Sequence, residues 1–173
     1  MTDGKRRLVC VLLGTLAVLF SAGTAFAVEI RGTISSTLII TEDSELVGDV
    51  TCTMTGAPCI TFGGSGLTLK LNGFSMTGQA DAATGCNGGA TGNENGILIN
   101  GRRGNVVQGP GVVRQFRAHG INISGGSSRI LVQVVTVSTN CQSGIFVSAS
   151  SENELEGNIA VRNGNAGAPC GGI

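Results

Sequence analysis

The chain of 173 residues contains no tryptophan, no tyrosine and only three prolines, and six phenylalanines are its whole aromatic content. A bulky aromatic core is therefore excluded, and so are the tyrosine and tryptophan platforms on which sugar rings stack. Basic and acidic residues are equal in number, 11 of each, and together make up 13% of the chain. Because neither sign dominates and no basic patch with interleaved aromatics occurs, nucleic acid is not expected as a partner.

The first 27 residues have the pattern of a secretory signal peptide. A basic cluster at residues 5–7 precedes an apolar run over residues 8–20, and Ala-Phe-Ala at residues 25–27 supplies the small residues that a signal peptidase reads. The run is shorter than the roughly 20 apolar residues of a membrane-spanning helix. We therefore predict a mature chain that starts near Val28, has no transmembrane segment, and is secreted, periplasmic or held at the cell surface.

Glycine is abundant, with 29 residues, and three Gly-Ile pairs recur at a fixed interval. Gly96, Gly120 and Gly144 each precede an isoleucine and stand 24 residues apart, so the segments that they begin are repeats of one structural unit. A gapless alignment of these segments keeps four columns aliphatic: Ile97/Ile121/Ile145, Ile99/Ile123/Val147, Val107/Leu131/Leu155 and Val113/Val137/Val161. The aliphatic positions alternate with other residues along the chain, and this alternation predicts three short strands in each unit. Units this short leave no room for crossover helices, so they are expected to stack as turns of a parallel β-helix about 4.8 Å apart.

The repeat also sets the boundaries of the predicted domains. After the signal peptide, residues 28–59 are expected to form a strand-rich cap, and residues 60–173 about four turns of an all-β coil. The turn before Gly96 has about twelve residues more than a regular turn. We predict that these extra residues form a surface loop over residues 79–94, a segment rich in glycine, alanine, asparagine and threonine.

The chain ends in Gly172-Ile173, which has the pattern of the first residues of another turn. This favours a chain that is the amino-terminal part of a longer protein or a truncated reading frame. A coil that ends on open strand edges also predicts end-to-end self-association.

Five cysteines follow the signal peptide, namely Cys52, Cys59, Cys86, Cys141 and Cys170. Export favours disulfides over metal ligation, because no CxxC pair occurs and His119 is the only histidine, so no metal and no other cofactor is expected. Cys52 and Cys59 can close a small loop. The repeat places the other three near one corner, where Cys141 is expected to pair with Cys170 or with Cys86.

Four segments carry a resemblance to a known superfamily: LKLNGFSMTG, GPGVVRQF, GINISGGSSRILVQVVTVSTN and GIFVSASSENELEGNIAVRNG. They resemble the right-handed parallel β-helix repeats of the pectate-lyase-like superfamily over about residues 60–173. The resemblance implies that fold, but it selects no activity, because the superfamily includes lyases, hydrolases, epimerases, phage tailspikes and exported proteins with no assigned reaction. Calcium is implied only if the chain is a lyase.

The carboxylates do not form a recognisable catalytic set, so the catalytic residues are unknown. Hydrolysis of acidic glycans needs two carboxylates at a controlled separation, whereas Asp43, Asp49 and Asp81 are scattered along the chain. Glu154 and Glu156 share an outward strand face and are more typical of a solvated surface than of an acid/base pair.

Basic residues form the one candidate binding strip. In the 24-residue alignment Arg114 and Arg162 share an outward column with Ser138 between them, and Arg117 and His119 follow Arg114 at the next corner. Such a strip could hold a uronate chain by charge-assisted hydrogen bonds. The alternative is that these arginines are ordinary surface residues and that His119 is a turn residue.

Two functions are compatible with the sequence. One is an exported, non-catalytic β-helix that binds an acidic polysaccharide or a cell-surface protein, or serves as a structural module. The other is a fragment of a lyase or epimerase for acidic glycans whose catalytic turns are missing. The lack of a carboxylate cluster favours the first.

Overall fold

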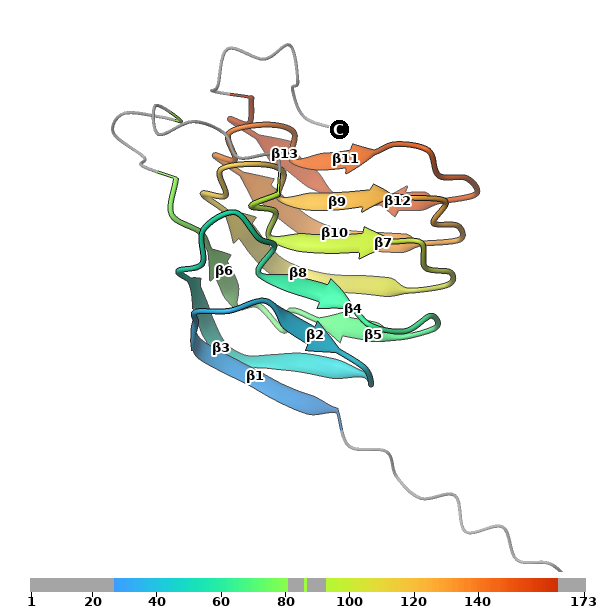
Figure 1. Ribbon diagram of the computed structural model, residues 1–173, viewed down its shortest axis with the longest axis horizontal. Coiled ribbons are helices and arrows are strands. Elements are labelled where there is room, and N and C mark those ends of the chain that lie inside the picture. The colour runs from blue at the N-terminus through green and yellow to red at the C-terminus, as the bar shows by residue number, and fades with distance from the viewer. Residues whose placement is uncertain (1–26, 81–85, 87–92, 165–173) are drawn as a thin grey trace, which may run out of the picture.

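The structure is a computed structural model that describes residues 27–80, 86 and 93–164, and all regular structure in these residues is β-strand (Figure 1). The strands are β1 (Val28–Ile34), β2 (Leu38–Ile40), β3 (Ser44–Cys52), β4 (Ile60–Phe62), β5 (Thr68–Lys70), β6 (Ser75–Thr77), β7 (Ile97–Asn100), β8 (Val106–Arg114), β9 (Ile121–Ser124), β10 (Leu131–Ser138), β11 (Ile145–Val147), β12 (Glu154–Glu156) and β13 (Ile159–Val161). Within this described part, no helix could cross a membrane.

The strands form two sheets in which neighbouring strands run parallel. Strands β2, β4, β7, β9 and β11 make a five-stranded sheet, and the other strands make an eight-stranded sheet in which β1, β3, β5, β8, β10 and β12 follow one another. Each turn supplies one strand to the first sheet and then continues into the second, so successive turns lie on one another (Figure 1). With the handedness that parallel crossovers adopt, this is the predicted right-handed parallel β-helix.

Residues 28–59, expected as a cap, hold strands that belong to both sheets. Strand β1 pairs with β3 in the eight-stranded sheet, and β2 pairs with β4 in the five-stranded sheet. Their backbone groups are therefore satisfied by the same parallel ladders as those of the later turns.

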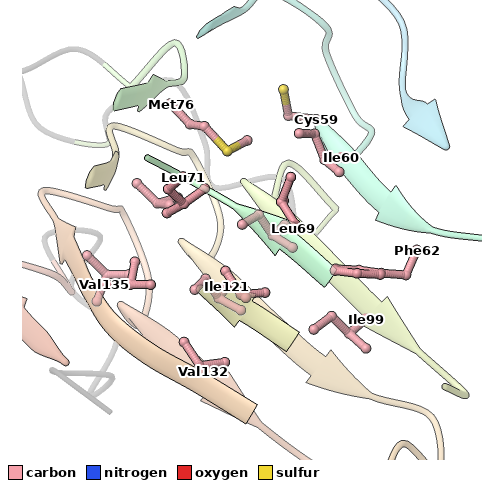
Figure 2. Close-up of a cluster of buried hydrophobic side chains, with 14 of the residues drawn as sticks. Cys59, Ile60, Phe62, Leu69, Leu71, Met76, Ile99, Ile121, Val132 and Val135 are labelled. Atoms are coloured by element: carbon pink, nitrogen blue, oxygen red, sulfur yellow. The ribbon is translucent and has the colours of Figure 1, made fainter. Parts of the chain in front are cut away.

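The core is a narrow aliphatic column between the sheets. Figure 2 shows Ile99 and Ile121 of the five-stranded sheet and Leu69 and Val132 of the eight-stranded sheet pointing into it, and all four are fully buried. Strand burial alternates, as in β7, where Ile97 and Ile99 are buried and the residues between and after them are not. The predicted alternation of strand faces is thereby confirmed.

The glycines of the Gly-Ile pairs occupy positions without room for a side chain. A Cβ at Gly96 would lie 2.6 Å from both the Gly120 carbonyl oxygen and a methyl of Val113, and a Cβ at Gly120 would lie 2.7 Å from the Gly144 oxygen. The repeated glycine thus permits close stacking of successive turns at this corner.

The gapless 24-residue alignment is correct for the five-stranded sheet and wrong for most of the other sheet. Ile97, Ile121 and Ile145 pair as expected. In the eight-stranded sheet, however, Val107 pairs with Val132 rather than Leu131, and Val137 pairs with Ala160 rather than Val161.

Bends and turns of unequal length cause this difference in register. The bend in β8 contains Gly109 and Pro110, where β10 has Val134 alone, and the ladder shifts between Gln133 and Val135. Hydrogen bonds set the register of each pair of strands separately. An extra residue in a bend or turn changes the sequence spacing between paired residues without breaking the ladder, so a fixed 24-residue period does not follow the register.

Candidate functional site

Buried polar side chains gather at the corner where the chain leaves the eight-stranded sheet and enters the five-stranded sheet. Glu94, Asn95, His119, Asn140 and Ser143 lie there, each with 6% exposure or less. We call these residues, with Arg117, Cys86 and Cys141, the insertion corner, because the predicted loop over residues 79–94 rejoins the coil here. Residues 81–85 and 87–92 of that loop lie outside the described part of the chain.

The charge of Arg117 is matched inside the insertion corner. A terminal guanidinium nitrogen of Arg117 lies 3.3 Å from Oε2 of Glu94, and the two side chains are 27% and 6% exposed. The second carboxylate oxygen, Oε1, accepts the Gly56 N–H at 2.7 Å. This ion pair therefore joins two turns to the end of the insertion.

His119 is held as a neutral ring. It stacks on Phe146 with ring centroids 4.3 Å apart, and its Nδ1 accepts the Ser143 N–H at 3.1 Å. Its backbone N–H donates to Oδ1 of Asn95 at 3.2 Å. Burial lowers the pKa of His119 to about 4, so the ring carries no charge at neutral pH and Nε2 bears the proton.

Asparagines form a ladder through the same corner that the sequence did not reveal. Oδ1 of Asn140 accepts the Phe116 N–H at 3.0 Å, and its Nδ2 donates to the carbonyl oxygen of Val113 at 3.3 Å and to Oδ1 of Asn163 at 3.0 Å. Asn163 repeats the pattern one turn later, accepting the Asn140 N–H and donating to Val137. The signal was present as a 23-residue spacing of asparagines, which an alignment fixed at 24 residues conceals.

The described residues form two disulfides, and both were among the expected pairings. Cys52 pairs with Cys59, and Cys86 pairs with Cys141. Cys170, the alternative partner of Cys141, lies outside the described residues.

Arg114 lies on a different surface, the outer face of the eight-stranded sheet. It is exposed, and its Nε donates to Oγ1 of Thr77 at 3.1 Å. The strand register places Thr33, Thr51, Thr77, Arg114, Ser138 and Val161 in one column across the sheet. We call this column the hydroxyl strip.

The expected alignment of Arg114 with Arg162 is wrong. Ser138 pairs with Arg114 on one side and with Val161 on the other, because the last turn repeats after 23 residues in this sheet. Arg162 is exposed one position beyond the strip, in the corner that follows β13, with a φ of 55°. The four predicted binding residues are therefore divided between the strip, the insertion corner and this last turn.

The aspartates that were considered as catalytic groups bind the next turn of backbone. Oδ1 of Asp43 accepts the Thr68 N–H at 2.8 Å, and Oδ1 of Asp49 accepts both the N–H and the hydroxyl of Ser75. These bonds from Ser75, with a further contribution from Arg114, lower the pKa of Asp49. Asp81 lies outside the described residues.

At the opposite corner, where the chain passes from the five-stranded to the eight-stranded sheet, the ion pair is solvated. Arg129 Nε lies 2.6 Å from Oε2 of Glu152, and the two side chains are 59% and 60% exposed. The hydrogen bond and charge of Arg129 lower the pKa of Glu152. Glu154 and Glu156 follow as exposed residues on either side of Leu155, which agrees with a solvated strand face.

Residues 53–171 match the family described as periplasmic copper-binding protein (NosD). Neither the curated proteins nor the solved structures contain a match to this chain. The family match covers more than half of the chain, and two disulfides accord with an oxidising compartment outside the cytoplasm. The chain therefore belongs to the NosD family and is an exported, secreted or periplasmic β-helix protein.

Proposed function

We propose that this chain is a non-catalytic exported module that binds an acidic glycan along the hydroxyl strip, with Arg114 as its central contact. The observation that carries the proposal is the exposed Arg114 guanidinium in a column of threonine and serine hydroxyls. A guanidinium can bind a uronate carboxylate through two hydrogen bonds, and neighbouring hydroxyls can bond to sugar hydroxyls. Parallel strands repeat these groups about every 4.8 Å along the coil, which suits an extended polymer.

The positions of Arg117 and His119 leave Arg114 as the stronger candidate for binding an anion. Arg117 is paired with Glu94, and His119 is neutral and buried against Phe146. Neither of these two residues is placed to bind an anion at neutral pH, so in this proposal Arg114 carries that role.

Copper does not enter this proposal, although the family description names it. The donors that Cu(I) and Cu(II) prefer are thiolate, thioether and imidazole. In the described residues the cysteines are paired, Nδ1 of His119 accepts the Ser143 N–H, and no group of three or more histidine, cysteine or acidic side chains is placed to hold a metal. The described cysteine, histidine and acidic side chains, with the disulfides formed, therefore do not fit a resident copper ion.

The test measures binding of the mature chain to polygalacturonate and to alginate by isothermal titration calorimetry. Dextran serves as the uncharged comparison. We expect binding to the two uronates alone, weakening with salt, and an Arg114→Gln variant about tenfold weaker, which corresponds to about 1.4 kcal/mol. Lys70→Gln is the matched control, because Lys70 is also exposed on the eight-stranded sheet but lies outside the strip. An equal loss of affinity in both variants would mean that binding depends on net charge alone, and it would contradict the role of the strip.

The same mixtures test the enzymatic alternative. With calcium added, absorbance of unsaturated uronate products should stay at the level of a control without protein. Product formation above that control would show lyase chemistry and overturn the non-catalytic function.

A further inference from the structure

We propose that the glycan of the hydroxyl strip is O-acylated, and that its acyl groups lie on an apolar patch beside Arg114. The apolar patch consists of Val112, Thr136, Ile159 and Val161. This inference rests on the proposed function and deepens it, because it names the chemical class of the glycan and the surface that distinguishes it from an unsubstituted polyuronate.

The apolar patch occupies one face of three neighbouring strands. Strand β10 pairs with β8 on one side and with β13 on the other, and Val112, Thr136 and Ile159 are successive partners in one column. Val161 follows Ile159 by two residues and therefore lies on the same face, whereas Ala160 between them packs against the core. The patch thus belongs to the outer face of the eight-stranded sheet, as the hydroxyl strip does.

Two aliphatic side chains of the patch are left in contact with water. Ile159 is 59% exposed and Val161 is 43% exposed, and Val112 and Thr136 beside them are partly buried. Neighbouring apolar groups on one exposed face favour a ligand that covers them, because apolar area is then removed from water. The patch begins about 7 Å from Arg114, at Val112 two residues earlier on β8.

The two sides of Arg114 differ in their chemistry. On the side of β3 and β6, Asp49 is exposed and its Oδ1 accepts the N–H and hydroxyl of Ser75, while Thr77 accepts the Nε–H of Arg114. On the side of β13, the apolar patch contains no charged side chain. A ligand carboxylate is attracted by Arg114 and repelled by Asp49, so the charge distribution places apolar substituents of an acidic polymer on the β13 side.

O-acylation meets both requirements in one polymer. An acyl ester on a sugar hydroxyl adds a methyl or longer apolar group and leaves the uronate carboxylate charged. Arg114 can then bind the carboxylate while the apolar patch covers the acyl group. A methyl ester of the carboxylate itself does not suit this surface, because it removes the charge that Arg114 binds.

The experiment compares alginate that has been chemically O-acetylated with the same preparation after alkaline deacetylation. The two polymers carry the same carboxylates, so isothermal titration calorimetry with the mature chain isolates the effect of the acetyl groups. We expect about fourfold tighter binding of the acetylated polymer, which is the effect of covering one methyl-sized group. This preference should persist at high salt, where both affinities fall.

The outcomes separate this inference from the proposed function. Equal affinity for the two polymers would overturn the inference and leave glycan binding by the strip intact. Binding of neither polymer would overturn the proposed function, and the inference with it.

A double variant, Ile159→Ser/Val161→Ser, locates the preference. It should bind acetylated alginate no more tightly than the deacetylated polymer, whose affinity should be unchanged. Ile39→Ser is the matched control, because Ile39 is also 59% exposed but belongs to β2 of the five-stranded sheet, and it should keep the preference. Arg114→Gln should weaken the binding of both polymers by the same factor. A preference that persists in the double variant would contradict the role of the patch.

Sedimentation velocity without glycan tests a second copy of the chain as the occupant of the patch. We expect the unaltered chain and the double variant to sediment alike over the same range of concentrations. Self-association that the double variant abolishes would overturn the inference, because the patch would then be a contact between copies.

Discussion

The insertion corner and the opposite corner each contain an ion pair between successive turns, but the two pairs differ in burial. Glu94 and Arg117 are 6% and 27% exposed, whereas Arg129 and Glu152 are 59% and 60% exposed. Water screens the exposed pair and replaces its hydrogen bonds, but a buried carboxylate that loses its partner stays unsolvated. Two different corners of one coil can thus carry similar ion pairs that contribute very differently to stability.

The largest expected difference between the corners concerns their asparagines. Asn140 is fully buried and bonds to Phe116, Val113 and Asn163, whereas Asn153 is partly buried and accepts the Ile130 N–H. Asn140→Ala should lower the free energy of unfolding by about 2 to 4 kcal/mol, because buried backbone groups lose their partners, and Asn153→Ala by about 1 kcal/mol. Urea unfolding followed by circular dichroism measures both, and equal losses would remove the distinction between the corners.

A smaller effect should appear as a pH dependence between pH 6.5 and 4, which the insertion corner shows through His119. The pKa of His119 is lowered from 6.5 to about 4, so the unfolded chain binds a proton between these values that the folded chain does not. Stability from this residue is therefore complete above pH 6.5 and falls as the pH drops toward 4. The shift corresponds to at most about 3 kcal/mol, which partial solvent contact reduces to about 2 kcal/mol.

The measurement compares urea unfolding at pH 7 and pH 4.5 for the unaltered chain and for His119→Phe, which keeps an aromatic ring on Phe146. The variant should lose less stability on acidification than the unaltered chain. Identical pH profiles would mean that His119 is not the titrating group.

The smallest expected effect separates the two ion pairs. Glu94→Gln should lower the free energy of unfolding by about 1 kcal/mol, because it weakens the bonds to Arg117 and Gly56 in a buried site. Glu152→Gln, the matched change in the solvated pair of the opposite corner, should leave stability unchanged within error. Thermal unfolding at low and high salt provides the measurement, and a larger loss for Glu152→Gln would reverse the comparison.

The sequence was sufficient for the fold because the aliphatic columns determine which face of each strand is buried. Ile97, Ile121 and Ile145 aligned correctly, since no bend interrupts that sheet. Leu131, by contrast, was placed in one column with Val107, whereas the buried Val132 is the residue that pairs with Val107, because turns and bends can gain or lose a residue without breaking the strand ladder.

The candidate site was less predictable than the fold because its partners come from separate turns. The sequence indicated that Arg117 and His119 lie at a corner, but nothing in the repeat pairs them with Glu94 or Phe146. Burial and pairing of a charged side chain depend on neighbours that only the folded coil brings together. Arg114, by contrast, was correctly placed on an outward strand face by alternation alone.

Binding of polygalacturonate by Arg114→Gln and Arg117→Gln variants, each first shown to be folded by circular dichroism, tests the proposed division of roles most directly. The two changes remove the same charge within one stretch of chain, but Arg114 lies in the exposed hydroxyl strip and Arg117 is paired with Glu94. We predict about tenfold weaker binding for Arg114→Gln and unchanged binding for Arg117→Gln. Unchanged binding for Arg114→Gln with a loss for Arg117→Gln would contradict the proposal and place the binding surface at the insertion corner.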